Sequence, residues 1–385
     1  MSGTRQGIRK RWDPSFIIYP DDFPEFCSTY LSDQEEQILF IAVTGFDPRA
    51  CAGCSKLIDE SGAENITAIL VDIDEGRTSP SSEHEDLIEE NKDVFDNILA
   101  DVDDVRNVTI EMWKGKGLSK RRANPRNAQQ ILPAESELHS YDKVIFDISA
   151  MPKSVMFSVI GKAISIFNQG NDENSDVSDI YTIVTENPSL DKAIEAVGPE
   201  DTATYIPGYG THLEQEATLR DPSIWILVLG ENKTEHLRRA HNTIEPEEVL
   251  PVFPSPSRNP RRADDLLNEY HELLFDEWSV EPTNFVYASE SNPFDLYRQI
   301  LNVAMDYRDA LQPIGECKFA VTVTSSKLLS IGAMLGVLDL KWNDFSTGLA
   351  QVRYDGYRLP DGDSIITKDY DTNLYCVGLS GTPYE

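Results

Sequence analysis

The residues best placed to do chemistry are two lysines, each of which follows a short polar turn between an apolar run and an amphipathic segment. In FDISAMPKSVMFSV, the turn leads to Lys153 and Ser154. In VTVTSSKLLSIGAM, the serines Ser325 and Ser326 lead to Lys327. The first N–H groups of a helix have no partner inside it, and together with the helix dipole they favour an anion. A lysine in this first turn opposes the dipole, so its appearance twice predicts an anionic ligand.

Asp147 and Ser149 belong to the first of these turns. Asp147 ends the preceding apolar strand, where its carboxylate is suited to accept a hydrogen bond from a ribose hydroxyl. The structural alternative is that Ser149 caps the helix, Pro152 occupies its first turn and Lys153 is solvated. The sequence leaves both interpretations open.

Three further strand ends carry residues that point to the same chemistry. After the first strand, Arg49 is predicted to reach the sheet edge at which open α/β folds bind ligands, with an Asp47–Arg49 ion pair as the alternative. In the second half, Lys233 follows one strand, and Ser257 and Arg258 follow the next. Arginine forks suit phosphate recognition, although ordinary surface loops also carry such residues. The predicted ligand-binding set is Arg49, Asp147, Ser149, Lys153, Ser154, Lys233, Ser257, Arg258, Ser325, Ser326 and Lys327.

The sequence carries none of the familiar catalytic motifs. It has no GxGxxG or Walker loop, and its six histidines lack a metal-ligand spacing. Cys51 and Cys54 form a CxxC at a predicted helix start, which suits either a redox role or two small buried residues. We therefore expect no metal and no cofactor, and a binding role rather than catalysis. The alternative is a nucleotide hydrolase or phosphodiesterase in which Lys153 or Lys327 stabilises phosphate charge.

Composition limits the partners. The 385 residues are 40% hydrophobic, enough for two domains with cores, and their net charge of −32 argues against long nucleic acid. The acidity suits solubility or a basic partner protein. The five cysteines are too few for a disulfide framework, and no apolar run is long enough for a bilayer, so we expect a cytoplasmic protein without a membrane partner. The basic segment 114–126, KGKGLSKRRANPR, is predicted to be a loop or an arm that closes over an anionic ligand.

Apolar runs alternate with helical patterns along the chain, which predicts an α/β fold with two tandem Rossmann-like units and mainly parallel sheets. We expect an irregular N-terminal arm at 1–36, a first unit at 37–220 with the basic insertion 114–126, and a second unit at 221–385.

Offsets between equivalent residues favour an internal duplication. The offset is 186 residues between the first strands (Ile38 and Ile224), and it is 170 between Tyr205 of TYIPGY and Tyr375 of LYCVGL. Most of the decrease lies before the lysine turns, where an insertion of about the length of the basic segment would produce it.

A strand ending in Asp, a short polar turn, a lysine and a helix that begins with apolar residues resembles the ligand motif of CRISPR-associated Rossmann-fold (CARF) sensor domains. Asp147, Ser149, Lys153 and Met156 carry this resemblance, although Ala150–Pro152 stands where that turn typically has glycines. Two such units in one chain also resemble the SAVED sensor domains of antiphage systems. These families bind oligonucleotide second messengers between paired Rossmann-like units.

The resemblance implies a sensor in antiphage or stress signalling that acts through a separate effector. From the residues themselves we expect a binding protein for a nucleotide or another phosphorylated anion, held at a sheet edge or between the two copies, and read by a partner protein. An acidic interaction scaffold, whose turns are only capped helices, is a further alternative.

Overall fold

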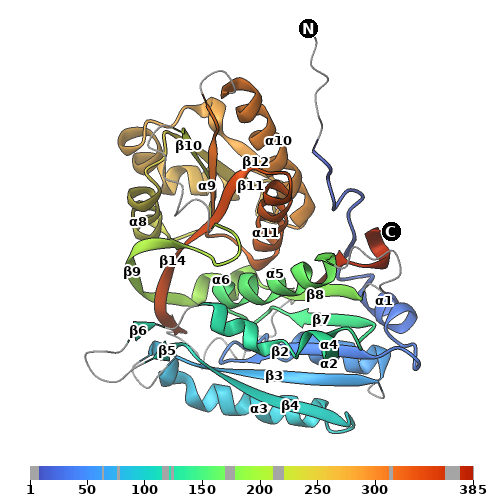
Figure 1. Cartoon of the computed structure of the whole chain (residues 1–385). Helices are drawn as coiled ribbons and strands as arrows, with labels where there is room; N and C mark the ends of the chain where they lie inside the picture. The colour runs from blue at the N-terminus through green and yellow to red at the C-terminus, as the bar shows by residue number, and fades with distance from the viewer. Residues whose placement is uncertain are drawn as a thin grey trace. The chain divides into compact units, whose positions relative to one another are not determined.

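The computed structural model describes residues 8–62, 65–75, 79–114, 121–122, 125–169, 178–210, 221–311, 315–359 and 373–384. These residues form two compact units (Figure 1). The first-sheet unit comprises residues 15–199 and 354–385, and the second-sheet unit comprises residues 1–14 and 200–353. Most of the basic segment, residues 115–120 and 123–124, lies outside the described part of the chain.

The first-sheet unit is built on a seven-stranded sheet of order β1-β15-β8-β7-β2-β3-β4. Its strands are β1 (Ile17–Ile18), β2 (Ile38–Thr44), β3 (Ile66–Asp74), β4 (Asp104–Glu111), β7 (Lys143–Asp147), β8 (Asp179–Glu186) and β15 (Asn373–Ser380). The five strands from β4 to β8 pair in parallel, whereas β15 pairs antiparallel with both β8 and β1. Its helices are α1 (Phe23–Tyr30), α2 (Ala52–Ser61), α3 (Glu85–Ile98), α4 (Glu135–Leu138), α5 (Lys153–Gln169) and α6 (Pro188–Ala193).

The second-sheet unit has a six-stranded sheet of order β12-β11-β10-β13-β14-β9. Its strands are β9 (Glu195–Tyr205), β10 (Ser223–Val228), β11 (Glu248–Pro254), β12 (Val286–Ala288), β13 (Lys318–Val323) and β14 (Ser346–Arg358). The strands from β12 to β14 pair in parallel. Its longer helices are α8 (Thr234–Ile244), α9 (Arg262–Glu269), α10 (Pro293–Leu311) and α11 (Lys327–Trp342). The short pair β5 (Trp113–Lys114) and β6 (Arg121–Arg122) forms a separate two-stranded sheet.

Both central strands are apolar without interruption, as the sequence predicts for parallel sheets covered on both faces. All seven residues of β2 are buried, and so are the last five of β10. On one face of the first sheet, Phe40 packs in a core with Phe26 of α1, Leu57 of α2 and Phe95 of α3. In the second unit, Trp225 packs in a core with residues of α8 and α9. The predicted α/β class with two mainly parallel sheets is confirmed.

The last strand of each half lies in the other half's sheet. In the chain, β9 follows the first sheet's strand β8, yet β9 neighbours β14 in the second sheet. Likewise, β15 follows β14, yet β15 pairs with β8 in the first sheet. The units therefore differ from the ranges 37–220 and 221–385 drawn from the sequence. Alternating apolar residues identify a strand, but they do not specify which sheet edge it completes.

The segment expected to be an irregular arm also carries regular structure. Residues 1–36 include β1 and α1, and the side chains of Trp12, Phe23 and Phe26 in it are buried. The prediction missed these elements because prolines and acidic residues interrupt the hydrophobic pattern there.

The strand exchange predicts that β15 stabilises the first sheet. Val377 is fully buried in β15, and its substitution by Ala should lower the free energy of unfolding of the protein by about 2 kcal/mol. Hydrogen exchange measured by mass spectrometry should then show faster exchange in β8 and β7, with β10 and β13 unchanged. The matched control is Val352→Ala in β14, which is equally buried and should affect the second sheet instead. Faster exchange in β10 and β13 of Val377→Ala would contradict this assignment.

Candidate functional site

Each sheet has one point at which the chain reverses its direction of winding. From β2 the chain moves to β3 on one side, and it later returns to β7 on the other. In the second sheet, β10 stands in the same relation to β11 and β13. Open α/β sheets bind ligands at the carboxyl ends of the two strands that flank such a switch point. The turns after β2 and β7, and after β10 and β13, therefore form the two candidate sites.

Both predicted lysine turns lie at these switch points. The helix α5 begins at Lys153 after β7, and α11 begins at Lys327 after β13. The predicted helix starts are thus confirmed, and the two lysines occupy equivalent positions in the two sheets. Both side chains are partly exposed.

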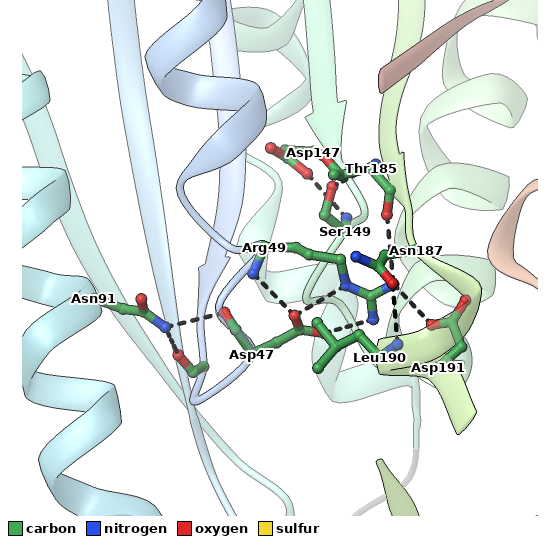
Figure 2. A network of polar contacts seen from close by, with 10 residues as sticks. Asp47, Arg49, Asn91, Asp147, Ser149, Thr185, Asn187, Leu190 and Asp191 are labelled. Carbon is green, nitrogen blue, oxygen red and sulfur yellow. Dashed lines mark hydrogen bonds and ion pairs between the residues drawn. The ribbon is translucent and has the colours of Figure 1, made fainter. Parts of the chain in front are cut away.

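Arg49 is held inside the first sheet's edge by carboxylates (Figure 2). Its guanidinium nitrogens lie 3.0 and 2.8 Å from the two carboxylate oxygens of Asp47, and Nη1 lies 2.7 Å from Asp191 Oδ1 of α6. Only 5% of the Arg49 side chain is exposed. Burial acts to lower the pKa of Arg49, but the charges of Asp47 and Asp191 outweigh it and raise that pKa. The structure therefore uses Arg49 to join the β2–α2 turn to α6, which matches the structural alternative.

Asp147 and Ser149 also bond within the protein. The backbone N–H of Ser149 donates to Asp147 Oδ1 at 2.9 Å, and Ser149 Oγ accepts from the backbone N–H of Thr185 at 2.9 Å. Ser149 therefore ties the β7–α5 turn to β8. The sequence had left open whether Ser149 binds a ligand or caps α5. Both residues are buried.

The carboxylate of Asp147 approaches the first turn of α2 closely. A Cβ added at Gly53 would lie 2.2 Å from Asp147 Oδ2, so only glycine leaves room for this approach. A carboxylate against the first turn of a helix is favourable, and it fixes β7 relative to α2. In the first sheet, the other two members of the predicted set, Lys153 and Ser154, form the first turn of α5.

Two asparagines complete the first edge and escaped the sequence analysis. Asn91 of α3 donates to the carbonyl oxygens of Gly45 and Asp47 at 2.6 and 3.0 Å. Asn187 caps α6, since its Oδ1 accepts from the N–H of Leu190 at 3.0 Å. The sequence offered a signal only for Asn187, which precedes Pro188 as a capping residue often does.

In the second sheet the two turns at the switch point touch directly. The N–H of Gly230 donates to Thr324 Oγ1 at 3.0 Å, and a Cβ at Gly230 would lie 2.3 Å from the carbonyl oxygen of Thr324. Ser326 is the N-cap of α11, because its hydroxyl accepts from the N–H of Leu329 at 3.2 Å. Ser325 is buried beside it. Of the two serines before Lys327, Ser326 therefore caps α11.

The remaining predicted residues follow neighbouring strands of the second sheet. Lys233 is the residue before α8, and its backbone N–H donates to the Tyr270 hydroxyl at 3.0 Å. Ser257 Oγ donates to the carbonyl oxygen of Asn259 at 2.5 Å, and the exposed Arg258 donates its backbone N–H to Glu290 at 2.9 Å. Since β11, β10 and β13 are adjacent and parallel, their turns bring Lys233, Arg258 and Lys327 to one edge of this sheet.

Arg262 plays the same structural part in the second sheet as Arg49 in the first. Its guanidinium makes two hydrogen bonds with Glu231, at 2.7 and 2.9 Å, and one with Glu290 at 2.7 Å. These carboxylates follow β10 and β12, so Arg262 joins the turns on either side of β11. At both edges a largely buried arginine is therefore neutralised by two acidic residues.

The CxxC cysteines are structural in character. Cys51 and Cys54 are buried free thiols, and burial together with the Asp147 charge raises the pKa of Cys51 to about 12. The same causes raise the pKa of Cys54 further. A helix start lowers the pKa of a nearby thiol, but here burial outweighs that effect.

Within the described residues, no group of three His, Cys, Asp or Glu side chains is arranged to hold a metal ion. Over the same part of the chain, every helix is too short or too polar to cross a membrane.

Comparisons with known proteins return similarity to solved structures alone. No protein-family model and no curated protein matches the sequence. A protein assigned to the universal stress proteins of Pseudomonas aeruginosa UCBPP-PA14 aligns with 86% of this chain and 97% of its own, at 10% identity and a TM-score of 0.22. A functionally unknown protein from Pseudomonas aeruginosa PAO1 aligns over 86% and 96% of the two chains, at 10% identity and a TM-score of 0.21. The α/β class rests on the strand order of the chain itself.

Removing the buried arginine should destabilise the first-sheet unit. Arg49→Ala leaves Asp47 buried without its counter-charge, which should cost about 3–5 kcal/mol in urea unfolding. Arg358→Ala is the control, because the Arg358–Glu195 pair is half exposed and should contribute less than about 1 kcal/mol. Equal losses for the two variants would contradict a structural role for Arg49.

The raised thiol pKa predicts unreactive cysteines. A thiol whose pKa lies well above the solution pH stays protonated, so Cys51 and Cys54 should resist a thiol-reactive dye at about pH 8. Denaturation restores the ordinary pKa, and all five cysteines should then react. Rapid labelling of Cys54 in the native protein, identified by peptide mass, would show that the site is redox-competent after all.

Proposed function

We propose that the protein binds a phosphorylated anionic ligand, in particular a nucleotide, at its lysine-bearing sheet edges, and that a partner protein reads the bound state. One observation carries the proposal. Lys153 and Lys327 begin the helices after β7 and β13, the two strands that pair with the central strands at the switch points.

The electrostatics of these two positions favour an anion. A lysine at the first residue of a helix faces the positive end of the helix dipole, and a negative charge at the same place offsets this repulsion. A phosphate at that place would contact both the lysine and the first backbone N–H groups of the helix. The chain as a whole is strongly acidic, so a positive group kept at both matched positions is notable against the net charge of −32.

The structure also suggests a division of roles among the predicted residues. Lys153 and Ser154 at the first edge, and Lys327 with Lys233 and Arg258 at the second, are proposed to contact the ligand. Arg49, Asp147 and Ser149 are proposed to hold the first turn in place through the bonds described above. Ser325, Ser326 and Ser257 would support the second edge in the same way.

The CARF-like and SAVED-like motif at Asp147, Ser149, Lys153 and Met156 suggests a finer version of the proposal. In that version the ligand is an oligonucleotide second messenger, and the protein is the sensor of an antiphage or stress response. Comparing the affinity for a mononucleotide with that for an oligonucleotide distinguishes this version from the binding of one mononucleotide at each sheet edge.

A thermal-shift titration with nucleotides tests the proposal. ATP, cyclic oligoadenylates and adenosine should be compared, because a phosphate-dependent site responds to the first two and ignores adenosine. A ligand at about 100 times its dissociation constant stabilises the native state by about 2.7 kcal/mol. Lys153→Ala and Lys327→Ala should each weaken binding by about tenfold, or about 1.4 kcal/mol.

The matched control is Lys162→Ala, which removes the same charge from a later turn of α5 and should leave binding unchanged. Absence of a shift with every phosphorylated compound would overturn the proposal. Release of phosphate during incubation would instead identify an enzyme that uses the same turns.

A further inference from the structure

The N-terminal segment docks on the second-sheet unit through side chains rather than through a regular element. Residues 8–14 belong to this unit, yet they form neither a strand nor a helix. Trp12 is 2% exposed, packed edge-on against Tyr297 of α10 and stacked on Trp342 of α11, with ring centroids 5.7 Å apart in both cases. The indole therefore acts as the anchor of the segment.

Arg11 lies beside this anchor in an acidic and aromatic setting. Its guanidinium lies 4.6 Å from the Trp342 ring centroid, and its Nε lies 3.7 Å from Asp339 Oδ1. The backbone N–H of Arg11 donates to Asp339 Oδ2 at 3.2 Å. A cation over an indole face and beside a carboxylate is a recognised mode of guanidinium binding.

Asp339 explains why the segment is bound specifically. It is fully buried in the last turn of α11, where an isolated carboxylate is costly. Burial raises the pKa of Asp339, and the Tyr297 hydroxyl, which donates to it at 2.6 Å, and the groups of Arg11 act in the opposite direction. The carboxylate of Asp339 also accepts from the side-chain amide of Asn343 at 3.3 Å, so its partners come both from α10 and the end of α11 and from the docked segment.

The residues on either side of Arg11 and Trp12 also make polar contacts with α10. Lys10 donates to Asn302 at 3.4 Å, and Asp13 lies 3.8 Å from Arg298. Both of these flanking contacts are long, while the indole is buried almost completely. Such a combination of one anchor, one specific charge and weak flanks is typical of a docked linear motif.

We propose that this α10–α11 docking face, formed by Tyr297, Arg298, Asn302, Asp339 and Trp342, is a receptor for a basic-aromatic segment of a partner protein. Residues 10–13 occupy it in cis and thereby block it. The partner's segment carries Arg-Trp at its centre, because the stacked guanidinium and the buried indole are the two groups that the face receives. Opposite charges assist this association, since the whole chain carries a net charge of −32.

The test adds the N-terminal segment as a separate peptide to a full-length variant in which the anchoring residues of its own segment are substituted. In the double variant Arg11→Ala/Trp12→Ala, a fluorescent peptide of residues 8–14, IRKRWDP, should bind by anisotropy. The wild type should bind it at least about tenfold more weakly, because the tethered segment competes at an effective concentration on the order of 1 mM. Adding Asp339→Asn to the double variant should also weaken binding by about tenfold.

A scrambled peptide of the same composition is the control for general charge attraction. Equal binding of the scrambled peptide, equal binding by the wild type, or absence of binding to the folded double variant would each overturn the proposal. If the double variant does not fold, Arg11→Ala replaces it, because this change keeps the buried indole. Arg11→Ala should then bind the peptide more tightly than the wild type does, and failure to do so would also overturn the proposal.

Discussion

Parallel pairing around one central strand in each sheet is the constraint on which the rest of the structure depends. The register of β2 with β3 and β7, and of β10 with β11 and β13, places the carboxyl ends of three strands at one edge. Every residue of the predicted ligand-binding set ends or follows one of those strands. The central strands can occupy these positions only because their side chains are apolar on both faces, which fixes them in the interior.

The same constraint explains the buried arginines. At a carboxyl edge, successive turns present unpaired backbone groups and acidic capping residues, and these must be joined without burying uncompensated charge. Arg49 and Arg262 each supply several donors in a fixed geometry and cross-link two turns. Because each guanidinium is paired with two carboxylates, its charge is neutralised within the turns that it joins.

The duplication is asymmetric in its details. Lys153 and Lys327 are equivalent in topology, but the turn before Lys153 is joined to β8 through Ser149, whereas the turn before Lys327 touches the β10–α8 turn through Thr324. The docked N-terminal segment is a further difference, because Arg11 and Trp12 pack on α10 and α11 in the second-sheet unit. Two similar folds can therefore serve separate purposes within one chain.

The sequence by itself determined the α/β class, the central strands and the two lysine helix starts, because uninterrupted apolar runs and punctuated turns are local patterns. The sequence also allowed the Asp47–Arg49 ion pair to be predicted as an alternative, since two residues so close in the chain can meet in any compact turn. Only the tertiary structure decided that β9 lies in the second sheet and β15 in the first. It also decided that Asp191 and Asn91 join the first sheet edge, and that Trp12 docks beside Asp339. These contacts connect residues far apart in the chain, and their partners are selected by packing and charge in three dimensions, which no local pattern encodes.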